Sequence, residues 1–294
     1  MASTEIKTDD AVFDLPDGSR VLYRDSSHRY WLLNAEAEVV PGAKVQTTPL
    51  VGVTSIIGCL DKPALLPWVE EQTCIAVQAL AESGPVDLAA PALRVAMRES
   101  QVGWQFTRDK RATSGTSIHD ALEQLAREGK NPRLADFPEQ DRGFVRGLAS
   151  FWLDARPDVI ATEVVVASGE HGIAGRLDLH ARIAERELVV DAASGERATF
   201  GPGRFLWDAK TSKAVHPVEN FTQLAGYEIL FRESHDQAGT DGQIVLRLDE
   251  SGSYEVALST AVPGDFLAIL GAYETAKRLR ASRPRKAKRE PVGA

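Results

Sequence analysis

The sequence predicts an α/β fold in which a mixed β-sheet is flanked by helices. Apolar residues recur at helical spacing in some segments, β-branched residues fill others, and glycine-containing turns separate the β-rich runs. In chain order, the expected elements are a helix at 139–155, strands at 159–167, 172–183 and 204–209, a helix at 218–232, strands at 243–248 and 254–258, and a helix at 264–280. This order is typical of a sheet whose faces are covered by helices.

The first hundred or so residues are expected to form a mainly helical N-terminal arm that carries a small β element. Residues 12–33 alternate apolar and polar positions around the turn signal Pro16-Asp17-Gly18, which indicates short strands. Residues 53–57 lead into a helix over 62–82, where apolar residues follow helical spacing, and another helix is expected at 91–100. The β element is expected to be an appendage to the main sheet.

The next helix is expected to begin at Ser114-Gly115-Thr116-Ser117, whose hydroxyl groups suit N-cap positions. An apolar stripe at i, i+3, i+4 and i+7 starts at Ile118 and stops before Gly129. This spacing places His119 near the start of the helix. Residues 185–203 combine a short apolar run with a turn-like Ser-Gly-Glu and are expected to form a hairpin extension between two strands.

Length and composition exclude several classes of protein. With 294 residues, the chain can bury a self-sufficient core as one large domain or two small ones. No window approaches the roughly 20 apolar residues of a membrane helix, and the N-terminus lacks the basic start and apolar run of a secretory signal. We therefore expect a soluble, cytoplasmic protein with no membrane partner. Cys59 and Cys74 are too few for a disulfide framework or a four-cysteine metal site, and are expected to be reduced structural residues.

Charge is distributed unevenly along the chain. Residues 277–290 hold eight Lys or Arg and one Glu, so the rest of the chain carries 26 bases against 41 acids. A strongly acidic body argues against a broad surface that coats DNA, but it permits a narrow basic groove and suits a site that gathers carboxylates around a divalent metal. The basic tail is expected either to grip phosphates through counterion release or to be a solvated, disordered end.

Four short segments carry side chains suited to one reaction, namely residues 115–119, 175–178, 207–212 and 223–227. Asp208 and Lys210 lie two residues apart, so their side chains share one face of a strand and can address one reacting group. Hydrolysis of a phosphodiester needs an attacking hydroxide and relief of the charge that builds on the phosphate oxygens. A divalent metal supplies both.

The residue types in these segments are those that bind hard divalent cations. Asp178 and Asp208 are expected to bind Mg²⁺ or Mn²⁺, with the backbone carbonyl of Ala209 and the imidazole of His119 completing the set. Lys210 is a compact cation beside the expected metal. It is expected to position or activate the attacking water and to stabilise the transition state.

In this order, His119, the run Gly175-Arg176-Leu177-Asp178, Asp208-Ala209-Lys210 and a Gln-x-x-x-Tyr helix resemble the RecB-type branch of the PD-(D/E)XK nuclease superfamily. The resemblance spans about residues 114–230. It extends more loosely upstream, where residues 53–57 and 61–65 are similar to phage-encoded exonucleases of this branch. It implies a restriction-endonuclease-like nuclease core over 106–276, preceded by an arm over 1–105 and followed by the basic tail over 277–294.

The resemblance implies a nuclease acting on DNA ends in recombination, repair or phage replication, most simply an exonuclease, located in a bacterial host cell if it is phage-encoded. It assigns metal ligation to His119, Asp178 and Asp208, catalysis to Lys210, and phosphate or DNA contact to Gln223 and Tyr227. Arg176, Thr211 and Ser212 are further candidates for phosphate contact, and Glu163 is a candidate extra acid. CRISPR-associated relatives carry four cysteines for an iron–sulfur cluster, and a chain with two cysteines cannot hold one in that way.

Several alternatives remain open. An Asp-x-Lys at a strand edge is often a solvated pair, His119 could be a structural helix histidine, and Arg176 could pair with a core carboxylate instead of phosphate. The chain could also be a catalytically silent DNA-binding or assembly protein on the nuclease fold, or a restriction or defence endonuclease with the same site. Beyond DNA, a recombinase, a helicase, a single-strand-binding protein or a second copy of the chain are open as partners. An acyl-transfer enzyme is excluded by the absence of a G-x-S-x-G elbow.

Overall fold

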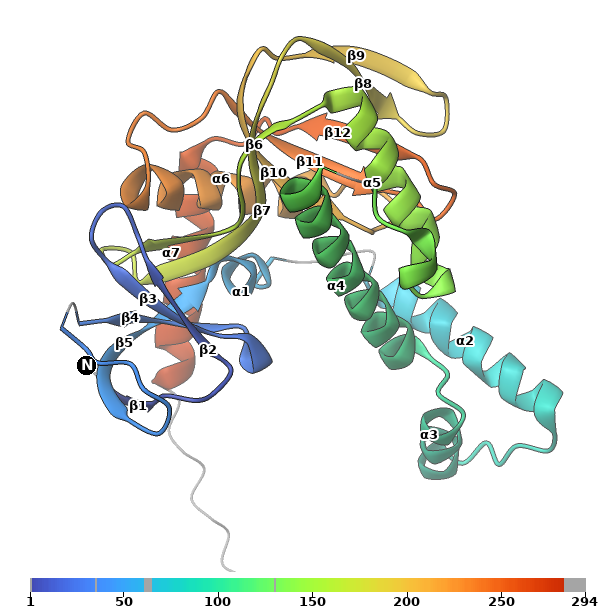
Figure 1. Cartoon of the computed structure of the whole chain (residues 1–294). Helices are drawn as coiled ribbons and strands as arrows, with labels where there is room; N and C mark the ends of the chain where they lie inside the picture. Colours follow the sequence, from blue (N-terminus) through green and yellow to red (C-terminus); the bar gives the residue numbers. More distant parts are fainter. Residues whose placement is uncertain (1, 35, 61–64, 130, 283–294) are drawn as a thin grey trace, which may run out of the picture.

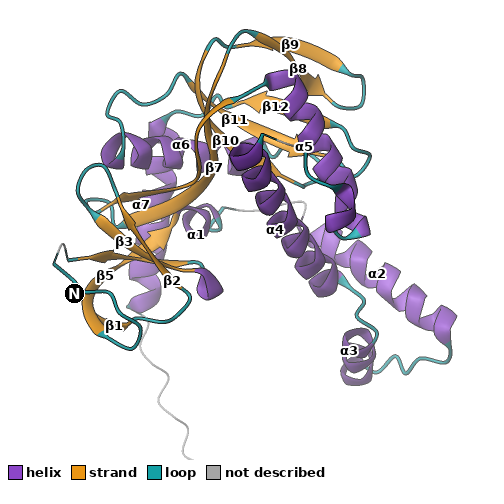
Figure 2. Cartoon of the chain, viewed as in Figure 1, coloured by secondary structure: helices purple, strands orange, loops and turns teal. Residues whose placement is uncertain are grey.

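A computed structural model describes residues 2–34, 36–60, 65–129 and 131–282 of the chain. At its centre is a ten-stranded sheet, parallel in part, with helices on both faces (Figures 1 and 2). The predicted class, a mixed sheet flanked by helices, is therefore confirmed.

The strands are β1 (Ala2–Glu5), β2 (Asp10–Asp14), β3 (Arg20–Arg24), β4 (Arg29–Leu33), β5 (Lys44–Gly52), β6 (Asp158–Ser168), β7 (Ile173–Ile183), β8 (Arg186–Asp191), β9 (Glu196–Phe200), β10 (Gly203–Lys210), β11 (Gly242–Leu248) and β12 (Tyr254–Leu258). The α-helices are α1 (Val53–Ile57), α2 (Leu65–Ser83), α3 (Ala90–Glu99), α4 (Trp104–Glu128), α5 (Arg142–Ala155), α6 (Pro217–Ser234) and α7 (Pro263–Ala281).

Strand β7 organises the sheet because it pairs on both edges. One edge pairs with β6 in an antiparallel hairpin. The other edge pairs first with β5, in parallel, and then with β10, antiparallel. Beyond β10 lie β11 and β12. The strands predicted from 159 onward are thus neighbours in one sheet, and the predicted hairpin extension is present as the separate two-stranded sheet β8–β9.

Two apolar cores fill the space between the sheet and its helices. On one face, α4 and α5 pack around Phe151 and Trp207, whose rings lie 5.1 Å apart. On the other face, α1, α6 and α7 pack around Leu224 and Phe266. Each large side chain buried in this way contributes roughly 1.5–3 kcal/mol to stability. The strands between the two cores are therefore held rigidly from both sides (Figure 1).

Strands β2, β3 and β4 confirm the β element predicted at residues 12–33. The prediction that the whole region is mainly helical is wrong for its first half, because residues 2–52 form five strands and the α-helices begin only at Val53. In the first part of β5, buried and exposed side chains alternate, with Val45 and Thr47 buried, but the alternation breaks at Pro49 before the buried Leu50. Pro49 and the preceding glycine-containing stretch obscure the strand in the sequence. Because β5 also pairs with β7, the N-terminal strands belong to the main sheet rather than forming an appendage.

Helix α4 begins at Trp104, so the prediction that it starts at Ser114 is also wrong. Hydroxyl residues favour N-caps but are tolerated within helices, and the cluster at 114–117 lies inside this one. His119 is consequently in the interior of a long helix. The expected boundary between residues 105 and 106 falls in the first turn of α4, and the division into three regions stays a prediction.

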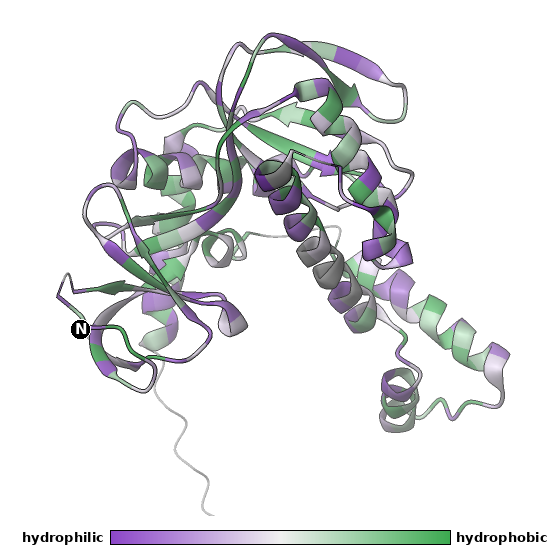
Figure 3. Cartoon of the chain, in the orientation of Figure 1, coloured by the Kyte–Doolittle hydropathy of each residue, from purple (hydrophilic) through white to green (hydrophobic). Residues whose placement is uncertain are grey.

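Helices α2 and α3 project away from the body of the molecule (Figure 1). Apolar colour runs along α2 in Figure 3, and its Leu66 and Ile75 side chains are exposed. Across the described ranges, no helix has both the length and the apolar character needed to span a membrane. The start of the helix predicted at 62–82 and most of the basic tail, residues 61–64 and 283–294, lie outside the described residues.

Candidate metal centre

The β6–β7 hairpin places two carboxylates opposite each other. Ser168 pairs with Ile173 next to the turn, and Glu163 lies as far before this pair as Asp178 lies after it. Glu163 has a backbone φ of +50°, a left-handed conformation that costs roughly 1–3 kcal/mol in a residue with a side chain. Such strain persists where the surrounding structure enforces it and is concentrated at functional sites.

The side chains of β7 change faces at Asp178. Gly175 and Leu177 face α6, whereas Leu179 belongs to the core under α4 and α5. In a regular strand, Leu177 and Leu179 would share one face, because side chains alternate with period two. The change lies directly across the hairpin from the strained Glu163. It lets Asp178 face α4 while Asp208, on the neighbouring strand β10, faces α6.

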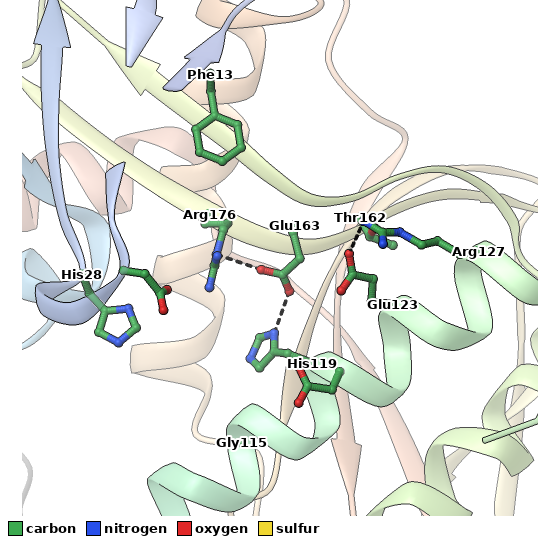
Figure 4. A pocket seen from close by; sticks show the side chains of 11 residues that line it. Phe13, His28, Gly115, His119, Glu123, Arg127, Thr162, Glu163 and Arg176 are labelled. Carbon is green, nitrogen blue, oxygen red and sulfur yellow. Dashed lines mark hydrogen bonds and ion pairs between the residues drawn. The ribbon is translucent and has the colours of Figure 1, made fainter. Parts of the chain in front are cut away.

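His119 reaches this pair of acids from α4, and Figure 4 shows its contact with Glu163. Its Nδ1 lies 2.8 Å from Glu163 Oε1 and 3.4 Å from Asp178 Oδ1. One ligand atom from each of His119, Glu163 and Asp178 lies within 4.8 Å of the others. Two carboxylates and an imidazole suit a divalent ion such as Mn²⁺ or Mg²⁺, so the donor set fits the predicted metal.

Electrostatics in this group favour a bound positive charge. The negative charge of Asp178, together with the hydrogen bond to Glu163, raises the pKa of His119 to about 9 despite partial burial. Burial raises the pKa of Asp178, and the nearby charge of Asp208 adds to this effect, while His119 and Lys210 oppose it. His119 therefore carries a proton at neutral pH in the place where a cation would bind.

Asp208 and Lys210 form the second half of the site. They lie on one side of β10, as predicted, and the ammonium of Lys210 pairs with Asp208 Oδ2. The other oxygen, Oδ1, lies 3.2 Å from Nε2 of Gln223, which donates to it. Burial opposes the charged form of Lys210, but the carboxylates of Asp208 and Asp178 outweigh it and raise the pKa of Lys210. Lys210 is thus a cation at neutral pH.

Asp178 connects the two halves. The pairing of β10 with β7 ends at Trp207 and Leu179. The backbone N–H of Ala209, two residues further along β10, therefore makes no backbone hydrogen bond to β7. It donates instead to Asp178 Oδ2 over 2.6 Å. Ala209 thus enters the site through its N–H, and its expected role as a carbonyl ligand stays a prediction.

Gln223 and Tyr227 lie one turn apart on α6 and are both buried. Gln223 Nε2 donates to the Tyr227 hydroxyl over 2.9 Å as well as to Asp208. The Tyr227 ring lies against Gly175, where any added Cβ would overlap with it. Gln223 thus holds Asp208 directly, and Tyr227 helps to hold Gln223 in place. Contact of Gln223 and Tyr227 with phosphate stays a prediction.

Arg176 pairs with a carboxylate, which was one of the two roles predicted for it. Its Nε lies 2.7 Å from Glu163 Oε2, and its guanidinium carbon lies 5.0 Å from the centre of the Tyr23 ring. Tyr23 lies on β3, among strands β1–β5, which form the N-terminal part of the main sheet and are called the N-terminal sheet hereafter. Thr211 and Ser212 follow β10, and the Ser212 hydroxyl donates to the carbonyl of Ala214 in its own loop. The N-terminal strands are thus in contact with the candidate metal group through Arg176.

Of the four predicted metal ligands, the structure brings His119 and Asp178 together, and Glu163 completes their group in place of Asp208. The sequence contained a signal for Glu163, because a hairpin turn at 169–172 implies the register that sets Glu163 opposite Asp178. Neither a scan against protein-family models nor a search of curated proteins found a match to the chain.

Proposed function

We propose that the protein is a divalent-metal-dependent deoxyribonuclease of the PD-(D/E)XK type, with a restriction-endonuclease-like core, and that it acts as an exonuclease on DNA ends. The observation that carries this proposal is the position of Asp178. One carboxylate oxygen faces His119 in the candidate metal group, and the other accepts the N–H of Ala209 between Asp208 and Lys210. Asp178 thus links the candidate metal group to the strand segment that carries the Lys210 cation. A metal and a fixed cation close to each other suit phosphodiester hydrolysis.

His119, Glu163 and Asp178 would hold Mg²⁺ or Mn²⁺. When bound there, such an ion lowers the pKa of a water molecule and offsets charge on the phosphate oxygens. For His119 to ligate, its imidazole must lose the proton that it shares with Glu163 and Asp178. Arg176, on the other side of Glu163, pairs with that carboxylate and orients it.

Lys210 acts in this scheme as a fixed positive charge rather than as a base. Its ammonium is held by Asp208, which Gln223 holds in turn. A compact cation placed beside a reacting phosphate stabilises the negative charge that develops in the transition state. Because its position is set before substrate binds, little reorganisation is needed during the reaction.

The proposal predicts that Lys210→Ala lowers kcat by roughly 100- to 1,000-fold, the usual cost of removing one such charge-stabilising group. Wild type and variant should be compared on matched linear and covalently closed circular duplex DNA, with Mg²⁺, Mn²⁺ or EDTA. Lys213→Ala is the matched control, since Lys213 is an exposed lysine outside the site. Metal-dependent loss of linear DNA alone, abolished in Lys210→Ala and retained in Lys213→Ala, is the expected result.

Other outcomes identify the alternatives. Cutting of the circular form as well would assign the same site to an endonuclease. If folded wild-type protein binds DNA but cuts neither form with either metal, the nuclease proposal is wrong and a catalytically silent DNA-binding protein takes its place. Full activity of Lys210→Ala would remove Lys210 from the site.

A further inference from the structure

A pocket of about 730 Å³ opens beside the candidate metal group, and the N-terminal sheet forms one of its walls. Phe13 of β2 and His28, next to β4, line that wall, while Asp120 and Glu123 of α4 line the other (Figure 4). The pocket shares His119 and Glu163 with the metal group, whereas Lys210 and Asp208 do not line it. It therefore adjoins the metal group without including Lys210, and a nucleotide that flanks the cleaved bond would be accommodated there.

The charges of the pocket suit a nucleobase better than a phosphate. Besides Glu163, three carboxylates line it, those of Asp25, Asp120 and Glu123. Its two arginines are already engaged, since Arg127 pairs with Glu123 and Arg176 pairs with Glu163. These arginines are therefore not free to bind a phosphate away from the metal group, whereas carboxylates accept hydrogen bonds from the exocyclic amino groups of bases.

Phe13 supplies the surface on which a base could stack. Its side chain is partly exposed and packs on its inner side against the apolar core of the N-terminal sheet. In Figure 4 the ring projects from its strand into the space above Arg176 and Glu163. Stacking of bases on aromatic side chains is largely independent of sequence, because every base has a π face.

The size of the pocket restricts the kind of DNA that can use it. Its volume falls in the range of small-molecule sites, about 300–1,000 Å³, which suits one nucleotide rather than a duplex. A base inside a duplex is covered by its neighbours on both faces, so it can stack on Phe13 only after it leaves the duplex. The occupant must therefore be unpaired.

We propose that this pocket binds the unpaired nucleotide next to the cleaved phosphate, with Phe13 stacking on its base and the carboxylates of the pocket receiving its amino groups. This rests on the proposed nuclease function and deepens it: the substrate is a single-stranded or frayed DNA end. The N-terminal sheet is then part of the substrate site rather than only a support for Arg176.

The test measures DNA binding rather than cleavage. Full-length Lys210→Ala protein with Mn²⁺ is titrated onto a fluorescently labelled oligodeoxyadenylate, and the measurement is repeated with Phe13→Leu, Phe13→Trp or Phe106→Ala added. Phe13→Leu keeps an apolar side chain for the core but removes the ring. Phe106 is the control, because it is an exposed phenylalanine on α4 that does not line the pocket.

Phe13→Leu should raise the dissociation constant about five- to hundredfold, the range for loss of one stacked base, while Phe13→Trp and Phe106→Ala keep it close to that of the parent. Binding of covalently closed duplex should not change in any of the three. An unchanged dissociation constant in Phe13→Leu, with a thermal unfolding temperature like that of the parent, overturns the subsite, as does an equal loss on closed duplex.

The two proposals fail separately. If wild type cuts DNA through Lys210 but Phe13→Leu binds normally, the nuclease stands and the base pocket falls. If wild type cuts nothing but Phe13→Leu loses single-strand binding, the nuclease falls and a single-strand binding site remains.

Discussion

His180 is a buried imidazole beside the site that takes no part in the proposed chemistry. Its ring meets Phe231 of α6 edge-on at 4.8 Å, and its Nε2 has no hydrogen-bond partner among the described residues. Burial, together with the positive charge of Arg204, lowers the pKa of His180 to about 4. The folded protein therefore keeps this histidine neutral at pH values where an unfolded chain would protonate it.

Stability should consequently fall in mild acid. Between the ordinary histidine pKa of about 6.5 and a folded-state pKa of about 4, the unfolded chain binds a proton that the folded chain excludes. The free energy of unfolding therefore drops as the pH decreases through this window, by about 1–3 kcal/mol. Above pH 6.5 this histidine adds no pH dependence.

Thermal unfolding in EDTA at pH 7.5 and 5.0 checks this expectation. His180→Phe keeps a ring against Phe231 but cannot titrate, so it should lose less stability between the two pH values than wild type does. His216→Gln, which removes an exposed imidazole, is the control and should behave like wild type. An identical pH dependence in wild type and His180→Phe would contradict the assignment.

At the same scale, the sequence predicted which residues of β7 and β10 lie close together better than it predicted the contacts that they make. Asp178, Asp208 and Lys210 lie together, as expected from residue type and spacing. Glu163 was only a candidate extra acid, because its place opposite Asp178 depends on hairpin register, and its left-handed φ follows from no local pattern. Likewise, the side of the sheet that Asp178 faces is set by the change of faces in β7, which contradicts the period-two rule used to read strands.

Among the elements, α6 is largely buried and carries Gln223, which donates to Asp208. It packs on the sheet through Tyr227 and on α7 through Gly226, where a Cβ would lie 2.7 Å from ring carbons of Phe266. Gly175 of β7 makes a similar close approach possible for the Tyr227 ring. Two glycines thus fix the distance of α6 from its neighbours, and with it the position of Gln223.

Gly226→Ala should therefore cost about 1–3 kcal/mol of unfolding free energy, the usual penalty for overpacking a core. Gly271→Ala is the matched control: it is also a helical glycine, on α7, but a Cβ there meets no atom within 4 Å. It should be neutral or stabilising by up to ~1 kcal/mol, because alanine favours helix more than glycine does. Urea unfolding midpoints measure both, and equal effects of the two substitutions would refute the packing argument.

Helices and strands after residue 139 were predictable because each carries a clear period of apolar residues between turn signals. The failures at β5 and at the start of α4 have separate causes. Pro49 interrupts the alternation of β5, and the hydroxyl cluster before His119 imitates a helix cap within a continuing helix. Both are local signals that long-range packing overrides.

On the scale of the whole molecule, the candidate metal group joins parts of the chain that are distant in sequence. His119 comes from α4, Glu163 and Asp178 come from the β6–β7 hairpin, and Arg176 links them to the N-terminal sheet. An unfolded chain would not assemble these ligands. Binding of a metal should therefore stabilise the folded state by mass action.

We expect Mn²⁺ at a hundredfold excess over its dissociation constant to add about 2.7 kcal/mol to the unfolding free energy, which raises the Tm by several degrees in a chain of this size. Asp178→Asn should abolish the shift. Glu185→Gln, which alters an exposed acid outside the site, should keep it. Scanning calorimetry with Mn²⁺ or EDTA gives the answer, and a full shift in Asp178→Asn would exclude this group as the metal site.

The short parallel pairing of Val51 and Gly52 with Ile173 and Ala174 has a consequence for synthesis of the protein. Strands β2 to β5 pair with one another in sequence and can form as soon as they leave the ribosome. Strand β5 can pair with β7 only after residues beyond 170 have been translated, on the order of 10 s later at about 5–20 residues per second. The strands that carry Phe13 can therefore form early in synthesis, and Glu163 and Asp178 of the β6–β7 hairpin join them later.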